Sequence, residues 1–337
     1  MLGQNPGWVT SQGEILAQLF SQAGYTVRLT SRIPERLPRL ADTLRTLFSW
    51  RREVDVLIHM VFSGTSFAVT DAASLLGRRL GLPQLFVLHG GNLPRFAARY
   101  PGWTARVLGR AERLAAPSGY LAHAMQSRGH TVRVIPNVLA LAQYPYRPRA
   151  ALRPRLLWMR TFHPVYHPEL AVETLARVAA SHPEARLTMA GQDKGQLAAT
   201  RALAAARGLQ ERVRFAGFLD LAGKQREFAQ HDIFLNTNRV DNMPVSVLEA
   251  AAFGLPVVAT AVGGIPFLLT HAETGLLVGT EDAAAMATAV TRLLHDPELA
   301  ARLGRNGRLL AESCAWERVK SQWEALFAEL RSERQNG

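Results

Sequence analysis

Short apolar runs alternate with stretches of helical periodicity along both halves of the 337-residue chain. Such runs are typical of buried parallel strands, because the connection between two parallel strands is usually a helix. The alternation therefore predicts an α/β fold with parallel sheets. The predicted strands are residues 25–30, 54–61, 84–89, 113–116 and 132–135 in the first half, and 155–159, 186–190, 213–216, 233–236 and 257–262 in the second. The predicted helices include residues 11–23, 36–52, 168–181, 196–207, 224–230, 244–253 and 316–330.

The length of the chain predicts two domains, since single hydrophobic cores stop growing at roughly 250–300 residues. Residues 143–155, QYPYRPRAALRPR, are rich in proline and arginine, which is typical of a linker. We therefore expect an N-terminal domain over residues 1–145 and a C-terminal domain over residues 146–315.

The most distinctive stretch of the sequence runs from Asp241 to Pro266 and reads DNMPVSVLEAAAFGLPVVATAVGGIP. Pro244 suits the first position of a helix, because it has no N–H to satisfy and its φ is already helical. The predicted helix carries Glu249 and precedes a buried strand. Gly263 and Gly264 then form a turn at which another molecule's backbone or a phosphate can approach closely.

This stretch resembles the donor-site signature of the family 4 retaining glycosyltransferases. That signature has two glutamates separated by seven residues, a helix of small residues, a PVVA-type strand and a VGG turn. Here Glu249 is the second acidic residue, and Asp241 replaces the first. The resemblance implies the GT-B fold, in which two Rossmann-like domains face a cleft. It also implies that the last helix, within residues 316–337, crosses back to the N-terminal domain.

The resemblance further implies that the chain uses a nucleoside-diphosphate sugar as co-substrate and needs neither a cofactor nor a metal ion. Arg160 matches the arginine that binds the leaving diphosphate, Glu249 the residue that binds the ribose, and Asp241 the residue that faces the donor sugar. The other residues expected to bind the donor are Gly191, Gly217, Phe218, Asn242, Met243, Gly263 and Gly264.

The chain departs from the family pattern at three positions. The lysine that usually follows the arginine is missing, and the segment TFHPVYHPEL offers His163, Tyr166 and His167 instead. A histidine is fully charged only when it is protonated, so neutralisation of the phosphates is expected to be weaker or pH dependent. Pro244 replaces a glycine and removes an N–H that could contact the sugar. Asp241 withdraws its carboxylate by one methylene relative to a glutamate.

His89 is followed by two glycines and Asn92 at the end of a predicted strand. Ligands of open parallel sheets bind beyond the carboxyl ends of strands, so this histidine is well placed for a site. It is similar to the family's histidine that reaches the donor sugar across the cleft, whereas the alternative is a histidine that only caps a strand. The next segment, PRFAARYPGW, contains Arg95, Arg99 and Trp103. It is interpreted either as an acceptor-binding loop or as a surface helix.

Nearly all the excess charge lies in the first half of the chain. Residues 1–150 carry 18 arginines and no lysine against 7 acidic residues, which accounts for +11 of the net charge of +12. This asymmetry indicates an anionic partner, such as a phospholipid surface or an anionic acceptor. Nucleic acid is the least favoured partner, because no zinc spacing, RNA-binding aromatic motif or helix-turn-helix pattern is present.

The predicted helix 36–52 has an apolar stripe with arginines around it and Trp50 near its end. One interpretation is a basic amphipathic helix lying on an anionic membrane, with Arg45 among its contacts. The other, which we favour, is an ordinary covering helix whose leucines are core and whose arginines are solvated.

The compartment and the start of the chain are also subjects of prediction. The single cysteine, Cys314, excludes an internal disulfide and fits a reducing compartment, so we expect a cytoplasmic protein. The basic first half adds the expectation that it is peripheral on the inner face of the plasma membrane. The first residues show no signal-peptide pattern and read as a loop that follows a strand. We therefore expect the natural reading frame to begin upstream of Met1.

These observations favour a retaining hexosyltransferase that acts on a lipid-linked or cell-surface glycan. The alternatives are a sugar-nucleotide-binding subunit with impaired catalysis, which the missing lysine and Asp241 would suit, and a sugar epimerase of the same fold.

Overall fold

The computed structural model describes residues 11–33, 35–149 and 151–335, so the predicted opening loop, residues 1–10, lies outside the described residues. The chain divides into two compact units. The first unit comprises Met1–Val138 and Trp316–Gly337, and the second comprises Leu139–Ala315. None of the helices in the described ranges is long and apolar enough to cross a membrane.

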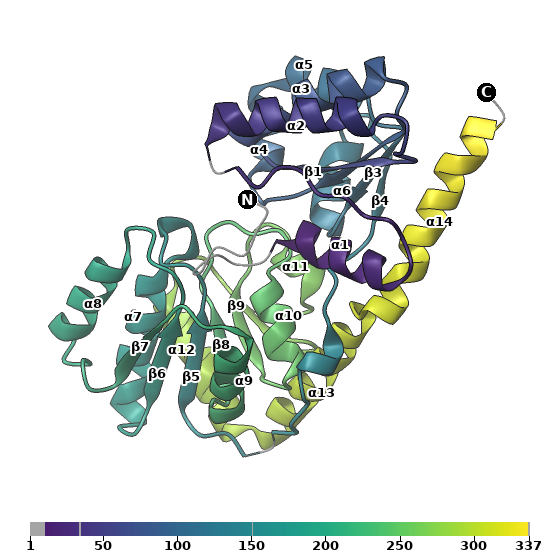
Figure 1. Cartoon of the computed structure of the whole chain (residues 1–337). Helices are drawn as coiled ribbons and strands as arrows, with labels where there is room; N and C mark the ends of the chain where they lie inside the picture. Colours follow the sequence, from purple (N-terminus) through teal and green to yellow (C-terminus); the bar gives the residue numbers. More distant parts are fainter. Residues whose placement is uncertain (1–10, 34, 150, 336–337) are drawn as a thin grey trace. The chain divides into compact units, whose positions relative to one another are not determined.

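The first unit is built on a four-stranded parallel sheet with the strand order β1-β2-β3-β4. Figure 1 labels β1, β3 and β4 of this sheet. The strands are β1 (Leu57–Val61), β2 (Gln84–Leu88), β3 (Arg113–Ala116) and β4 (Val132–Val134). The helices are α1 (Gln12–Gln22), α2 (Arg36–Trp50), α3 (Thr65–Arg79), α4 (Leu93–Arg99), α5 (Pro101–Leu108), α6 (Gly119–Gln126) and α14 (Trp316–Gln335).

Both faces of the first sheet are buried, as a parallel sheet requires. Alternate residues of β2 point to opposite faces, so Leu85 and Val87 pack in one cluster with Phe20 of α1 and Trp323 of α14. Phe86 and Leu88 pack on the other face with residues of α3 and α6. The last helix of the chain is therefore part of the core of the first unit.

The predicted strand at residues 25–30 is wrong. Burial alternates over Tyr25–Arg28 as in a strand, but no ladder partner exists for this segment among the described residues. A strand is defined by hydrogen bonds to a neighbour, and alternation of apolar residues cannot show whether such a neighbour is present.

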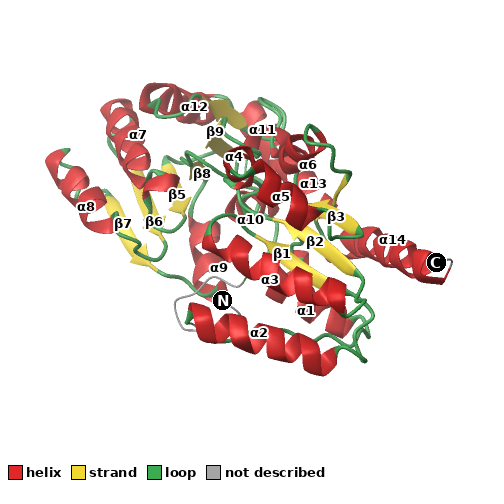
Figure 2. Cartoon of the chain, turned by 90° about the horizontal axis from the view of Figure 1, so that it is seen from above, coloured by secondary structure: helices red, strands yellow, loops and turns green. Residues whose placement is uncertain are grey.

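Helix α2 packs against α3, and Figure 2 shows the two helices running side by side. Thr43 and Leu47 are buried, but Leu37 and Phe48 are 79% and 53% exposed. The favoured prediction that its leucines are core is therefore only partly confirmed. Apolar periodicity places Leu37 and Phe48 on the stripe of α2. It does not show how much of the helix surface α3 covers.

The second unit is built on a six-stranded parallel sheet with the order β10-β9-β8-β5-β6-β7. Its strands are β5 (Arg155–Met159), β6 (Arg186–Ala190), β7 (Val213–Gly217), β8 (Ile233–Asn236), β9 (Val257–Thr260) and β10 (Leu276–Val278). Its α-helices are α7 (Pro168–Ser181), α8 (Leu197–Ala206), α9 (Leu221–Gln230), α10 (Val245–Ala252), α11 (Ile265–Leu268), α12 (Ala283–His295) and α13 (Pro297–Ser313). Helix α10 begins one residue after Pro244, which is its N-cap.

Helix α10 is rich in small residues because α13 packs closely against it. A Cβ atom on Gly304 of α13 would lie 2.9 Å from the Gly254 carbonyl oxygen, and one on Gly307 would lie 3.3 Å from the Ala251 Cβ. Gly307 thus faces Ala251 of α10, and Gly304 faces Gly254 just after it, which lets the two backbones approach. This packing fixes the helix that carries Glu249.

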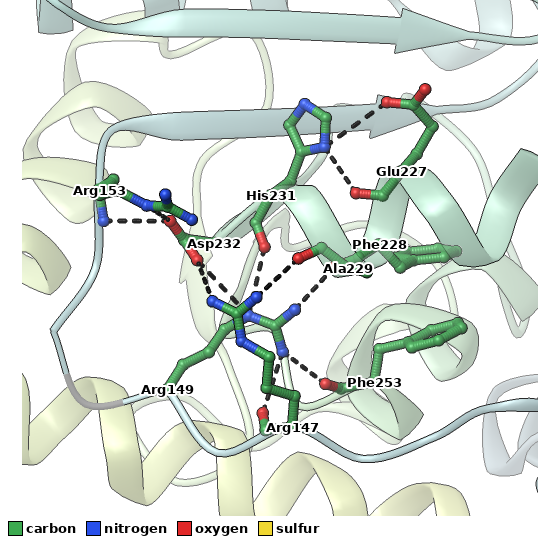
Figure 3. Close-up of polar contacts among 9 residues, drawn as sticks. All are labelled: Arg147, Arg149, Arg153, Glu227, Phe228, Ala229, His231, Asp232 and Phe253. Carbon is green, nitrogen blue, oxygen red and sulfur yellow. Dashed lines mark hydrogen bonds and ion pairs between the residues drawn. The ribbon is translucent and has the colours of Figure 1, made fainter.

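A buried arginine cluster joins the segment before β5 to the ends of two helices (Figure 3). The Arg149 side chain is 1% exposed and donates to the carbonyl oxygens of Phe228 at 2.7 Å, His231 at 3.2 Å and Phe253 at 2.5 Å. These carbonyls lie at the C-terminal ends of α9 and α10, where a cation is favoured. Asp232, also 1% exposed, contacts Arg147, Arg149 and Arg153. The predicted linker is thus anchored on the second unit.

Candidate functional site

The carboxyl ends of parallel strands lie along one edge of a sheet, and three predicted site residues follow neighbouring strands there. Arg160 follows β5, Gly191 follows β6 and Gly217 ends β7. The Arg160 N–H donates to the Ala190 carbonyl oxygen at 3.1 Å, and the Gly191 N–H donates to that of Gly217 at 2.8 Å. Gly191 has a φ of 153°, and a Cβ atom there would lie 1.8 Å from the Arg160 carbonyl oxygen, so only glycine fits.

The loop after β8 and the loop after β9 meet at the same edge. The Gly264 N–H donates to the Asp241 carbonyl oxygen at 3.1 Å. A Cβ atom on Gly263 would lie 2.1 Å from that oxygen, and one on Gly264 would lie 1.9 Å from the Asn242 carbonyl oxygen. The glycine pair is therefore required by close contact with the chain's own backbone, which the sequence alone did not reveal.

The side chains of Arg160 and Asp241 form an ion pair at this edge. The Arg160 Nη2 lies 2.6 Å from the Asp241 Oδ2, and the two side chains are 17% and 12% exposed. The same Oδ2 accepts from the Asn238 Nδ2 at 2.5 Å, and Oδ1 accepts from the Asn242 N–H at 2.7 Å. The guanidinium also lies over the ring of Tyr166, 4.1 Å from its centroid. Two residues that lie 81 positions apart in the sequence thus form one ion pair.

Glu249 lies in a second polar cluster, which sequence reasoning missed. Its carboxylate, 5% exposed, accepts from the Lys224 Nζ at 2.8 Å and 3.2 Å and from the Tyr144 hydroxyl at 3.1 Å. Burial, and then the Glu249 charge, raise the pKa of Tyr144, so its hydroxyl stays protonated and donates. One signal was available: the chain has only three lysines, and Lys224 is one of them.

Two histidines lie in the segment after β5 from which the lysine is missing. The His163 Nδ1 accepts from the Val165 N–H at 3.2 Å, which uses this nitrogen within the loop. Burial, and then the nearby Arg239 charge, lower the pKa of His167, so it is neutral at pH 7. His167 therefore does not replace the missing lysine as a charge, and the pH-dependent contribution of the histidines stays a prediction.

His89 follows β2 in the first unit, where its backbone N–H donates to the Val61 carbonyl oxygen at 2.8 Å. Its ring stacks on Phe62 with centroids 5.1 Å apart and an interplanar angle of 18°. Its Nε2 lies 3.3 Å from the Met60 Sδ. Burial lowers the pKa of His89 to about 4, so the imidazole is neutral and can both donate and accept a hydrogen bond.

The residues proposed for an acceptor or a membrane occupy different environments. Arg95 and Arg99 are exposed on α4, and Arg45 is exposed on α2. Trp103 of α5 packs on Phe67 and Phe96, and its Nε1 donates to the Asp71 Oδ2 at 2.6 Å. The segment thus forms the two short helices α4 and α5, and Trp103 belongs to the packing of its unit, whereas acceptor binding by Arg95 and Arg99 stays a prediction. Trp50 is half-buried beneath Arg28, whose guanidinium carbon lies 5.2 Å from the ring centroid.

The remaining predicted donor residues differ in exposure. Phe218 is 41% exposed beside Gly217, whereas Asn242 and Met243 are buried. Within the described ranges, no group of three or more histidine, cysteine, aspartate or glutamate residues is placed to hold a metal ion.

Two sequence families match the chain over nearly all of its length. Residues 150–310 match the family described as Glycosyl transferases group 1, and residues 11–143 match Glycosyltransferase Family 4. The chain belongs to glycosyltransferase family 4. The first of these matches covers the signature around Asp241 and Glu249.

Similar solved structures show that this family 4 chain has the GT-B fold. Sucrose-phosphate synthase from Thermosynechococcus elongatus has a TM-score of 0.77 at 20% identity and covers 95% of this chain and 93% of that one. Anabaena HepE in complex with UDP has a TM-score of 0.75 at 18% identity, and the match covers 93% of this chain and 88% of that one.

A curated relative is D-inositol 3-phosphate glycosyltransferase of Streptomyces avermitilis. It is 27% identical over 279 residues, which cover 73% of this chain and 60% of that protein. The chain spans between 20% and 60% of the lengths of the first three curated relatives that it matches.

Proposed function

We propose that this chain transfers a hexose, with retention of configuration, from a nucleoside-diphosphate sugar to a lipid-linked or cell-surface glycan. The observation that carries the proposal is the gathering of Arg160, Asp241 and the glycine-bounded loops at the carboxyl edge of the second sheet. This edge is where open parallel sheets bind ligands. HepE, which shares the fold, binds UDP.

The residues of this edge provide what a diphosphate leaving group requires. Arg160 stabilises the negative charge that develops on the diphosphate as the glycosidic bond breaks. The N-terminus of α10, which has no side-chain cap, adds backbone N–H groups and the positive end of a helix dipole. Glu249, whose carboxylate is held by Lys224 and Tyr144, accepts a hydrogen bond from one ribose hydroxyl at the acceptor site that is left on Oε2. The departing diphosphate takes the proton of the acceptor hydroxyl, so no dedicated protein base is needed.

Release of a nucleoside diphosphate tests this function. We expect the purified chain to be stabilised against heat by one or two members of a panel of nucleotide sugars. A ligand at 100 times its dissociation constant stabilises a folded protein by about 2.7 kcal/mol. The stabilising donor should then release its nucleoside diphosphate when a glycan acceptor is supplied. Stabilisation without any release over a broad acceptor panel would favour the binding subunit with impaired catalysis.

We further propose that the acceptor is reached at an anionic inner membrane surface, on which the cytoplasmic chain is peripheral. The exposed Leu37 and Phe48 of α2, together with exposed arginines such as Arg45 and Arg52, support this proposal. Apolar side chains can enter the headgroup region while the arginines contact anionic lipids, each worth about 1 kcal/mol near the surface.

Flotation with liposomes that contain anionic phospholipid tests the membrane proposal. Replacing both Arg45 and Arg52 with serine is expected to weaken binding by about tenfold or more, since two such contacts are lost. The matched control replaces Arg302 and Arg305, two exposed arginines of α13, with serine. Equal binding by both double variants would contradict a role for α2.

A further inference from the structure

The guanidinium of Arg160 is held from two directions by side chains, and neither contact was expected from the sequence. Asp241 accepts from its Nη2 at 2.6 Å, and the Tyr166 ring lies beneath it at 4.1 Å. We propose that Asp241 and Tyr166 are positioning residues that orient Arg160 toward a diphosphate, and that Asp241 is the ion-pair partner of this arginine rather than a ligand of sugar hydroxyls. The inference rests on the proposed function, because it assumes that Arg160 binds a diphosphate.

The hydrogen bonds of Asp241 occupy most of its capacity. A carboxylate has about four lone-pair sites. Three are used within the chain: two on Oδ2, by Arg160 and Asn238, and one on Oδ1, by the Asn242 N–H. A residue that binds a sugar through two hydroxyls needs more free acceptor sites than remain. The aspartate that replaces the family's glutamate thus uses most of its hydrogen-bonding capacity within the protein.

The backbone at Tyr166 is anchored by the loop that follows β8. The Thr237 Oγ1 donates to the Tyr166 carbonyl oxygen at 2.7 Å and accepts from the Trp158 Nε1 at 2.8 Å. The Arg239 N–H donates to the Val165 carbonyl oxygen at 2.8 Å. The partly buried Tyr166 side chain packs against the hydrophobic core of the second unit and presents its ring face to the cation. Tyr166 lies in the segment that lacks the family's lysine, so this segment assists phosphate binding through the arginine.

The remaining donors of Arg160 are consistent with an anionic ligand. Its Nε is buried and has no hydrogen-bond partner in the part of the chain that the structure describes. Buried polar groups are normally hydrogen-bonded, and a guanidinium presents its donors in one plane as a fork that matches phosphate oxygens. Asp241 engages Nη2, so the unpartnered Nε and Nη1 are the nitrogens of the fork that can donate to phosphate oxygens.

The test compares ligands with and without the sugar. Calorimetric titration uses UDP and UDP-glucose, or GDP and GDP-mannose, according to which pair the wild-type chain binds. Asp241→Asn is expected to weaken binding of both members by the same factor, about tenfold, because the loss acts through Arg160. In an Arg160→Lys background, the same Asp241 substitution should change both affinities by less than about twofold.

Tyr166 is tested in the same titrations. Tyr166→Leu is expected to weaken both ligands about fivefold, whereas Tyr166→Phe keeps the ring face and restores the affinity. The unfolding temperature of each variant without ligand shows that it is folded. A loss confined to the sugar-bearing ligand would show that Asp241 contacts the sugar and would overturn the inference, as would unchanged affinities in Asp241→Asn and Tyr166→Leu. A chain that binds neither pair would instead contradict the proposed function.

Discussion

Replacing Arg160 with alanine is expected to lower kcat/KM for sugar transfer by about 100- to 1,000-fold. This is the range found when one preorganised donor to a developing negative charge is removed. Arg160 follows β5 at the carboxyl edge of the sheet, where His167 is neutral and the nearby Arg239 pairs with Glu281. Most of the charge stabilisation should therefore disappear with the Arg160 side chain.

The control for Arg160→Ala is Arg207→Ala. Arg207 also pairs with a carboxylate, that of Glu173 at 2.8 Å, but on the exposed surface between α8 and α7. Its loss should leave kcat/KM within about twofold, since exposed ion pairs contribute little. Initial rates of nucleoside diphosphate release would measure both variants. Similar rates for the two alanine variants would contradict a role of Arg160 in sugar transfer.

Replacing Arg149 with methionine is expected to lower the free energy of unfolding of the second unit by about 3–5 kcal/mol. Removing one partner from a buried charge network has this effect, because other buried groups lose their compensation. Here the buried guanidinium serves carbonyl oxygens at the ends of α9 and α10. Those oxygens would be left with fewer donors, and Asp232 would lose one of its three cations.

Arg153→Met is the matched control for Arg149→Met. Arg153 binds the same Asp232 at 3.0 Å, but its side chain is 51% exposed, so water can replace it. We expect a cost below about 1 kcal/mol. Urea unfolding would measure the free energy of unfolding of both variants. Hydrogen exchange of peptides from α9 and α10 would show that the change lies in the second unit. Equal costs for the two variants would contradict the importance of burial in this cluster.

The sequence predicts the edge of the second sheet well, because local signals specify it. Apolar runs define where β5, β6 and β8 end, and the residues after parallel strands must meet at one edge. The resemblance to the family singled out Arg160, Gly191 and Asp241, and the rule explains why the structure has them at one edge. The glycines at positions 191, 263 and 264 were also recognised as special, although their reason is the close approach of the chain's own backbone.

Other features depend on contacts between distant segments and could not be predicted. Lys224 pairs with Glu249 because the fold brings α9 and α10 together. The sequence next to either residue contains no motif that predicts this ion pair. The same holds for Arg149, which was assigned to a linker yet lies buried among helix ends. The wrong strand at residues 25–30 has a related cause, since its apolar alternation is local but strand pairing is not.

Hydrogen exchange of the whole chain, with and without the nucleoside-diphosphate sugar that stabilises it most, tests whether the donor binds at the carboxyl edge of the second sheet. We expect slower exchange in the loops after the strands of this sheet, within residues 160–167, 191–196, 217–220, 237–246 and 261–266. Peptides from α12 and α13 should exchange at unchanged rates. Protection that spares these loops, or that falls elsewhere in the second unit, would contradict a donor site at the carboxyl edge of this sheet.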